Sequence, residues 1–179
     1  LDSLATSTGL SFTGVPTAPG AELGALERPR VAIYKSWDPS MDEGWTRFTL
    51  EQWGFPYKSL LDAEMKAGNL AAKYDVIILP DDNVRMITGE RGPAGGGGGF
   101  GGPGQDPPPE FRSGIGAEGV TALKAFVQAG GTLVTFAEAG DFAIQKLEVP
   151  VRNVLANVPT KEFWSPGSTL RITVDNANP

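Results

Sequence analysis

The chain has neither cysteine nor histidine among its 179 residues. Catalytic pairs in which histidine activates serine or cysteine are therefore excluded, and so are disulfides and metal sites built on imidazole or thiolate. Carboxylate, lysine, tyrosine and serine side chains remain as groups that could take part in a reaction. These residue types alone do not identify a reaction. The lack of cysteine fits a secreted, a periplasmic or a cytoplasmic protein equally well.

Basic charge and long apolar runs are also scarce. The 15 Lys and Arg residues are outnumbered by 21 Asp and Glu residues, which gives a net charge of −6. A surface of this sign is unsuited to nucleic acid or to anionic lipid. Apolar runs stay well below the roughly 18 residues that a membrane-spanning helix needs. We therefore expect no nucleic-acid partner and no insertion into a membrane.

Glycine and proline, by contrast, are abundant and divide the chain. Residues 1–29 contain a Pro/Gly/Ala stretch and are expected to be a leader and linker, with one domain over residues 30–179. Residues 88–115 are expected to be an insertion in that domain, because most residues from Gly92 to Gly104 are glycine. A phosphate-binding loop would place its glycines directly between a strand and a helix. The run therefore indicates a low-complexity insertion.

Strand-like and helix-like patterns alternate along the domain. Continuous or alternating apolar residues predict strands at 30–34, 57–61, 75–80, 132–136 and 170–174. Helical spacing of apolar residues, with suitable residues at the ends, predicts helices at 40–53, 62–66, 116–129 and 141–147. In the first helix Ser40 and Glu43 form a capping box, while Met41, Trp45 and Phe48 recur on the expected apolar face.

This order of elements predicts an α/β protein with a three-layer, flavodoxin-like, doubly wound and mostly parallel sheet. The run 170–174 is expected to be an edge strand near the C-terminus, because its apolar residues alternate with polar ones. Ligands of such sheets bind in the crevice at the carboxyl ends of the strands. Any site should therefore be built from the turns at 35–38, 80–83 and 137–139.

Each of these turns carries candidate residues. Ser36, Trp37 and Asp38 combine an aromatic ring with a carboxylate, as sugar-binding sites do. The alternative is that this region only begins a helix, since the nearby acids suit a positive helix N-terminus. Asp81 and Asp82 could offer oxygen ligands to a cation. They lack the spacing of a calcium loop, so we expect a polar turn and no metal site.

Glu138 lies in the small-residue turn Phe136–Gly140, at the place that a nucleophile would take in a nucleophile elbow. A carboxylate there could act as an acid or a base, with Asp81 or Lys35 as its partner in a cryptic enzyme. The sequence identifies no partner base, and a motif without its partners is weak. A solvated glutamate is the favoured interpretation, so no catalytic residue is assigned.

Several longer stretches carry a further signal. They are Tyr34–Trp37 running into Ser40–Arg47, Tyr74–Pro80, Gly116–Leu133, Asp141–Ile144 and Pro150–Val154. Together they resemble the region downstream of the catalytic domain in large bacterial carboxypeptidase A-like zinc metallopeptidases. That region is similar to class I glutamine amidotransferase-like domains, which have a flavodoxin-like fold. Since the chain starts at Leu1 without an initiator Met, we expect it to be part of a longer polypeptide.

The catalysis of the amidotransferase family is not carried over to this chain, because the chain departs from the family's pattern. Active amidotransferases carry a cysteine at the elbow and a histidine and a glutamate later in the chain, whereas this chain has Glu138 there and no histidine. The peptidase zinc would be held by two histidines and a glutamate of the separate catalytic domain, so no cofactor is expected in this part. The implied partner is the peptidase domain of the same chain, with a second copy as an alternative. The implied localisation is secreted or periplasmic.

Three functions thus stand side by side at this point. The favoured one is a structural or interaction domain of a zinc carboxypeptidase-like protein involved in proteolysis. The second is a module that binds a carbohydrate or small molecule at the strand ends, through Ser36, Trp37, Asp38, Asp81, Asp82 and Glu138. The third is the cryptic carboxylate-based enzyme.

Overall fold

The computed structural model describes residues 2–17, 27–37, 40–90, 114–165, 167 and 169–173. Its centre is a sheet of four short strands: β1 (Val31–Tyr34), β2 (Tyr57–Leu60), β3 (Val76–Leu79) and β4 (Thr132–Thr135). The strand order is β2-β1-β3-β4, and every neighbouring pair is parallel. The helices are α1 (Asp2–Thr8), α2 (Met41–Gln52), α3 (Asp62–Ala67), the 3₁₀ turn η1 (Leu70–Ala72), α4 (Val84–Thr88), α5 (Gly116–Gln128) and α6 (Ala139–Lys146). The predicted α/β, flavodoxin-like class is confirmed.

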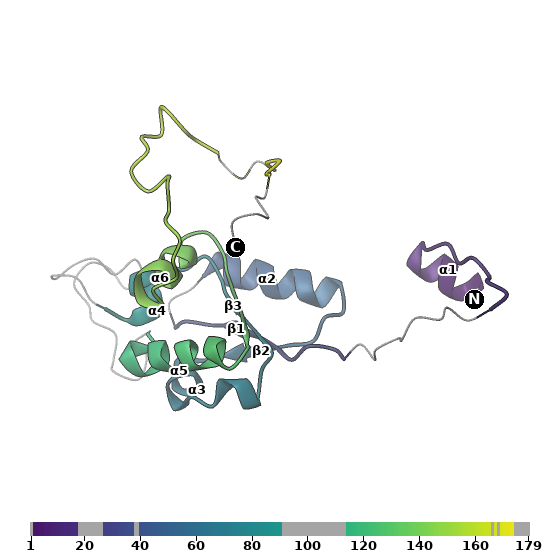
Figure 1. The fold of residues 1–179 in the computed structure, drawn as a ribbon, viewed down its shortest axis with the longest axis horizontal. Helices are drawn as coiled ribbons and strands as arrows, with labels where there is room; N and C mark the ends of the chain where they lie inside the picture. Colours follow the sequence, from purple (N-terminus) through teal and green to yellow (C-terminus); the bar gives the residue numbers. More distant parts are fainter. Residues whose placement is uncertain are drawn as a thin grey trace.

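The helices divide unequally between the two faces of the sheet (Figure 1). α2 lies on one face, where it contacts β1, whereas α3, α4, α5 and α6 gather on the other. Right-handed crossovers explain this division. The chain moves from β1 to β2 in one direction and from β2 through β3 to β4 in the opposite direction, so the helices of the later crossovers lie on the opposite face from α2.

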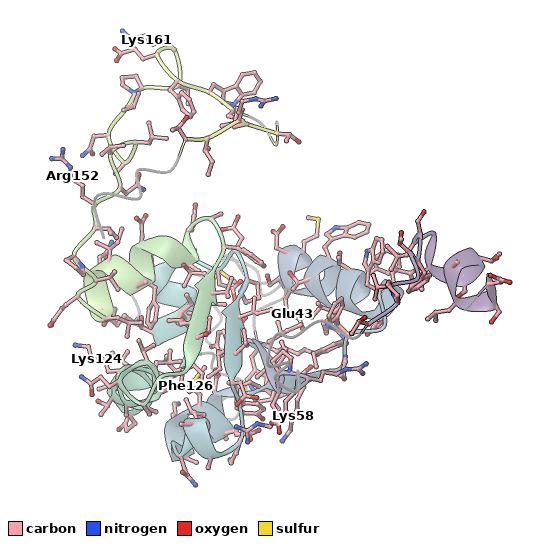
Figure 2. The ribbon with its side chains drawn as sticks, turned by 45° about the vertical axis from the view of Figure 1, so that its right-hand side comes forward. Glu43, Lys58, Lys124, Phe126, Arg152 and Lys161 are labelled. Atoms are coloured by element: carbon pink, nitrogen blue, oxygen red, sulfur yellow. The ribbon has the colours of Figure 1, made fainter. Side chains whose placement is uncertain are left out.

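The main hydrophobic core lies on the face that carries several helices. Successive side chains of a strand point to opposite faces, so Tyr34 and Leu79 point into this core while Ile33 and Ile78 point toward the α2 side. All four are buried. The core also contains buried side chains from each covering helix: Met65, Ile87, Leu123, Phe126 and Phe142. Figure 2 shows Phe126 turned from α5 toward the sheet and Lys124 turned away from it.

Two glycines end α5 where the sequence predicts. Gly130 has a φ of 92°, in the left-handed region that favours glycine, and its N–H donates to the Val127 carbonyl at 3.0 Å. Gly131 follows with the Phe126 ring so close that a Cβ would overlap it. The pair therefore stops the helix and lets the Phe126 ring pack over the chain returning to β4.

The two ends of the predicted 88–115 insertion meet at the body of the domain. The Ile115 N–H donates to the Ile87 carbonyl at 2.8 Å, and the backbones of Gly89 and Gly114 touch, with no room for a Cβ on Gly114. The two ends of the predicted insertion therefore lie side by side against the core. Residues 91–113 lie outside the described residues.

The predicted edge strand near the C-terminus is not formed in its described part. Residues 169–173 pair with no strand, and Leu170 and Ile172 are 57% and 76% exposed. The segment lies away from the sheet (Figure 1). The alternating pattern gives it an apolar side, but a strand also needs a neighbour to satisfy its backbone groups. In this arrangement β4 remains the outer strand.

An ion pair ties the beginning of β1 to the beginning of β3. The Arg30 backbone N–H and side chain donate to the Asp75 carboxylate at 2.7–3.1 Å. Arg30 also donates to the Ala72 carbonyl at 2.6 Å. The side-chain and backbone hydrogen bonds from Arg30 lower the pKa of Asp75 from 3.8 to about 2.

The Asp75→Asn variant tests this pair. Because the pKa of Asp75 is lower in the folded protein than in the unfolded chain, the pair stabilises the fold above pH 3.8, and this contribution is lost as the pH falls toward about 2. We expect Asp75→Asn to unfold at lower urea concentration at neutral pH and to lose part of the acid dependence in this interval. Asp2→Asn, in α1, is the control. Equal midpoints for Asp75→Asn and the parent protein at neutral pH would contradict the assignment.

Candidate functional site

The carboxyl end of β1 carries the first predicted turn. Ser36 is buried, whereas Trp37 is 57% exposed. Asp38 lies outside the described residues. In the described part of this turn, Trp37 therefore offers the large surface on which a ligand could stack.

The predicted turns at 80–83, after β3, and at 137–139, after β4, contact each other, as expected for neighbouring parallel strands. One oxygen of the Asp81 carboxylate accepts the Glu138 N–H at 2.9 Å. The contact uses the backbone of Glu138, and the Glu138 residue is exposed. Asp82 has a different environment, since it is 1% exposed and its N–H donates to the Pro80 carbonyl at 2.7 Å. Asp81 thus acts as an acceptor that holds the start of α6 against the end of β3.

The elbow-like turn does not place a reactive group at its strained position. Ala137 has a φ of 41°, while Glu138 has helical angles and is the N-cap residue of α6. In a nucleophile elbow the reactive residue occupies the strained turn. Here Ala137, whose side chain is a methyl group, occupies the strained position. The prediction that Glu138 lies there is wrong. The predicted helix start at Asp141 is also wrong, because α6 begins at Ala139.

Asp62, a buried carboxylate at the start of the predicted helix 62–66, joins separate segments of the chain. Leu61 is the N-cap residue of α3, and Asp62 accepts from the Tyr34 hydroxyl at 2.7 Å and the Gly114 N–H at 2.9 Å. These bonds join the end of β1, the start of α3 and the chain that returns from the insertion. One feature of the sequence does point to this hydrogen bond. Tyr34 ends an apolar strand, and the hydroxyl of a buried tyrosine needs a hydrogen-bond partner.

Helix α2 turns a charged side toward its own domain and an apolar side toward solvent, which is the reverse of the orientation that its sequence suggested. Its start is as predicted, since the Ser40 hydroxyl accepts the Glu43 N–H at 3.3 Å. Glu43 is buried, however, and its carboxylate pairs with Arg47 Nε at 2.7 Å. Figure 2 shows Glu43 between α2 and the rest of the domain. The charge of Glu43 raises the pKa of Arg47.

The opposite side of α2 is apolar and faces solvent. Met41, Trp45 and Phe48, called here the outer apolar face of α2, are 50–77% exposed. The Trp45 and Phe48 rings meet edge to face with centroids 5.8 Å apart. Trp53 and Phe55 are also exposed just beyond the helix. The sequence pattern predicts a helix here but assigns these side chains to the core.

A cavity of about 570 Å³ lies between α5, β4 and α6. Apolar side chains line it: Val127, Leu133, Ala143, Ile144 and Leu147. Lys124 and Glu148, also in its lining, form an ion pair at 3.4 Å. No sequence pattern predicts this cavity, because its walls come from three separate elements.

Acidic side chains do not gather into a metal site within the described ranges. No group of three or more Asp or Glu residues there has the placement of cation ligands. In the same ranges, no helix combines the length and the apolar character needed to cross a bilayer.

Comparisons of the chain with protein-family models, curated proteins and solved structures found no match. The resemblance to a domain of zinc metallopeptidases therefore stays a prediction.

The Tyr34→Phe variant tests the buried hydrogen bond to Asp62. Removing the hydroxyl leaves a buried carboxylate oxygen without its donor, which typically costs about 1–3 kcal/mol. Tyr57→Phe is the control, because the Tyr57 hydroxyl also binds a carboxylate, that of Glu51, but at an exposed position. We expect urea unfolding to show a clearly larger loss for Tyr34→Phe. Equal losses for the two variants would contradict the structural role of Asp62.

The Ala137→Gly variant tests the strain in the elbow-like turn. A left-handed conformation costs a residue with a Cβ roughly 1–2 kcal/mol. Glycine removes this cost, but its greater freedom in the unfolded chain offsets part of the resulting stabilisation. We expect a net stabilisation of about 0.5–1 kcal/mol by thermal or urea unfolding. Ala143→Gly, inside α6, is the matched control and should destabilise by about 1 kcal/mol. A loss of stability in Ala137→Gly would contradict the strained turn.

Proposed function

We propose that this chain is a non-catalytic interaction domain that docks onto another protein domain through the outer apolar face of α2. The observation that carries the proposal is the orientation of this helix. It turns an ion pair, Glu43 with Arg47, toward its own domain and three large apolar side chains toward solvent. A surface helix of an isolated domain normally does the reverse.

The composition of this face suits a protein interface. Tryptophan, phenylalanine and methionine are enriched in the buried centres of interfaces, and full burial of each such side chain is worth about 1.5–3 kcal/mol. Contiguous exposed apolar patches on soluble proteins mark interaction sites. Trp53 and Phe55 extend the apolar surface at the end of the helix.

The charges beside the face indicate the chemistry of the partner. At about 100° per residue, Asp42 lies to one side of Met41, Trp45 and Phe48, and Glu51 lies to the other. The chain as a whole is acidic. The partner surface is therefore apolar at its centre and basic at its rim.

The partner that we propose is the peptidase domain of a zinc carboxypeptidase-like polypeptide to which this chain belongs. This part of the proposal rests on the sequence resemblance, as do the role in proteolysis, a secreted or periplasmic localisation and the presence of zinc in the partner. The strand ends support a role without catalysis. The Asp81 carboxylate is bound to a backbone N–H, and Ala137 holds the strained position of the turn.

Hydroxyl-radical labelling would test the docking surface. The chain would be labelled alone and within the polypeptide that includes the peptidase domain. We expect several-fold less oxidation of Met41 and Trp45 in the longer polypeptide, because docking removes them from water. Trp164, which is also exposed in the chain alone and lies outside α2, is the internal control. Equal labelling of Met41 and Trp45 in the two samples would overturn the proposal.

A second candidate function is carbohydrate or small-molecule binding at the strand ends. The observation that favours it is the exposed ring of Trp37 directly after β1, since ligands of open α/β sheets bind at this edge. Titration of sugars against tryptophan fluorescence checks it, with Trp37→Ala as the variant that should lose the response and Trp164→Ala as the variant that should keep it.

A further inference from the structure

The cavity between α5, β4 and α6 lies apart from α2 and from the candidate residues at the strand ends. Its volume is about 570 Å³, which is within the range of pockets that hold small molecules. α5 and α6 are on the face of the sheet opposite to α2 (Figure 1). None of the candidate residues at the strand ends belongs to its lining. It is therefore a separate candidate site.

The walls of this cavity are apolar and partly open to solvent. Leu133 comes from β4, and Ile144 comes from α6. Val127 of α5 and Val151 also line the cavity, and both are exposed. An apolar side chain of a ligand would remove these surfaces from water, which favours its binding.

Two opposite charges lie on the solvent side of the cavity. Lys124 of α5 and Glu148, just beyond α6, both line it, and their Nζ and Oε1 atoms are 3.4 Å apart. The two side chains are 35% and 80% exposed, so both can meet a ligand that enters from solvent. Glu148 would repel a purely anionic head group, and Lys124 would repel a purely cationic one. A head group with one charge of each sign is therefore complementary to this pair.

The backbone of Glu148 has an unfavourable conformation. Glu148 follows Leu147, the C-cap residue of α6, and its φ is 59°, in the left-handed region where glycine is common after a helix. An ion pair this exposed contributes little to stability, less than the left-handed conformation costs a residue with a Cβ. The ion pair alone therefore does not account for a glutamate at this position. Residues held in such conformations gather at functional sites.

We propose that this cavity binds an α-amino acid with a large apolar side chain. The carboxylate of the ligand pairs with Lys124 and its ammonium group pairs with Glu148, so that the four charges alternate in sign. The apolar side chain of the ligand lies against Val127, Leu133 and Ile144. The ion pair between Lys124 and Glu148 holds the two charged groups near each other before binding, so less freedom is lost when the ligand enters.

Four related molecules test this assignment in amide NMR titrations of the full chain. L-Phenylalanine has the three groups that the proposal requires. Glycine lacks the apolar side chain, 3-phenylpropanoate lacks the ammonium group, and 2-phenylethylamine lacks the carboxylate. We expect L-phenylalanine to shift the signals of residues 133–135 and 140–148 until they saturate. Its affinity should exceed that of each other molecule by about tenfold, because each of them loses a charged hydrogen bond or the burial of a ring.

Three results of these titrations would overturn the proposal. The first is that L-phenylalanine causes no saturable shift of these signals up to its limit of solubility. The second is that another of the four molecules binds as tightly as L-phenylalanine, because the charges or the apolar walls would then not select the ligand. The third is that the same signals shift when the protein alone is concentrated and L-phenylalanine adds no further shift, because a second copy would then fill the cavity.

Variants at the two charges separate binding from folding. Lys124→Gln should weaken the binding of L-phenylalanine about tenfold and should leave the binding of 2-phenylethylamine, which has no carboxylate, without this loss. Glu148→Gly should raise the midpoint of urea unfolding, because glycine readily adopts the left-handed conformation. The same variant should nevertheless weaken the binding of L-phenylalanine about tenfold.

Lys146→Gln is the matched control for these variants. Lys146 also forms an ion pair at the end of α6, with Glu90, but it is not among the residues that line the cavity. We expect this variant to bind L-phenylalanine as the parent protein does. Unchanged binding by Glu148→Gly would overturn the proposal, because Glu148 would then make no contact with the ligand. A loss in Lys146→Gln equal to that in Lys124→Gln would also overturn it.

Discussion

The right-handed sense of the strand–helix–strand connections is the constraint on which the rest of this structure depends. Because the chain turns back at β2 and then continues through β3 to β4, one helix covers one face and the later helices cover the other. The core forms between the sheet and those later helices. Among the described residues, the position of α2 alone on its face and the place of β4 at the end of the strand order follow from the same path of the chain.

Three aspartates in this domain join backbone segments. Asp75 binds the Arg30 N–H and side chain, Asp62 binds the Gly114 N–H and Tyr34, and Asp81 binds the Glu138 N–H. Each strand has four residues and so makes few backbone hydrogen bonds to its neighbours. The contacts of these aspartates at the ends of the strands therefore add to the stability of the fold. Of these three aspartates, the sequence offered only Asp81 as a candidate site residue, and its carboxylate is part of the framework.

The surfaces that remain apolar lie apart from those acids. The outer apolar face of α2 lies on one side of the sheet and the cavity between α5, β4 and α6 on the other. The first is a convex row of side chains on one helix, whereas the second is a hollow with walls from three elements. The strained turn between them holds alanine, so this position adds no reactive group to the two surfaces.

The sequence by itself determined the type and order of the main elements, because helix and strand periodicity, the Ser40 cap and the Gly130 stop act between residues close in the chain. It also determined that cysteine and histidine chemistry is absent. Only the tertiary structure decided that Trp45 and Phe48 face outward, that Ala137 takes the strained position, and that residues 169–173 stand apart from β4. Periodicity shows that a helix or strand has an apolar side. Which side meets the core depends on neighbours that are distant in the chain, and those neighbours are brought into place by the path of the whole chain.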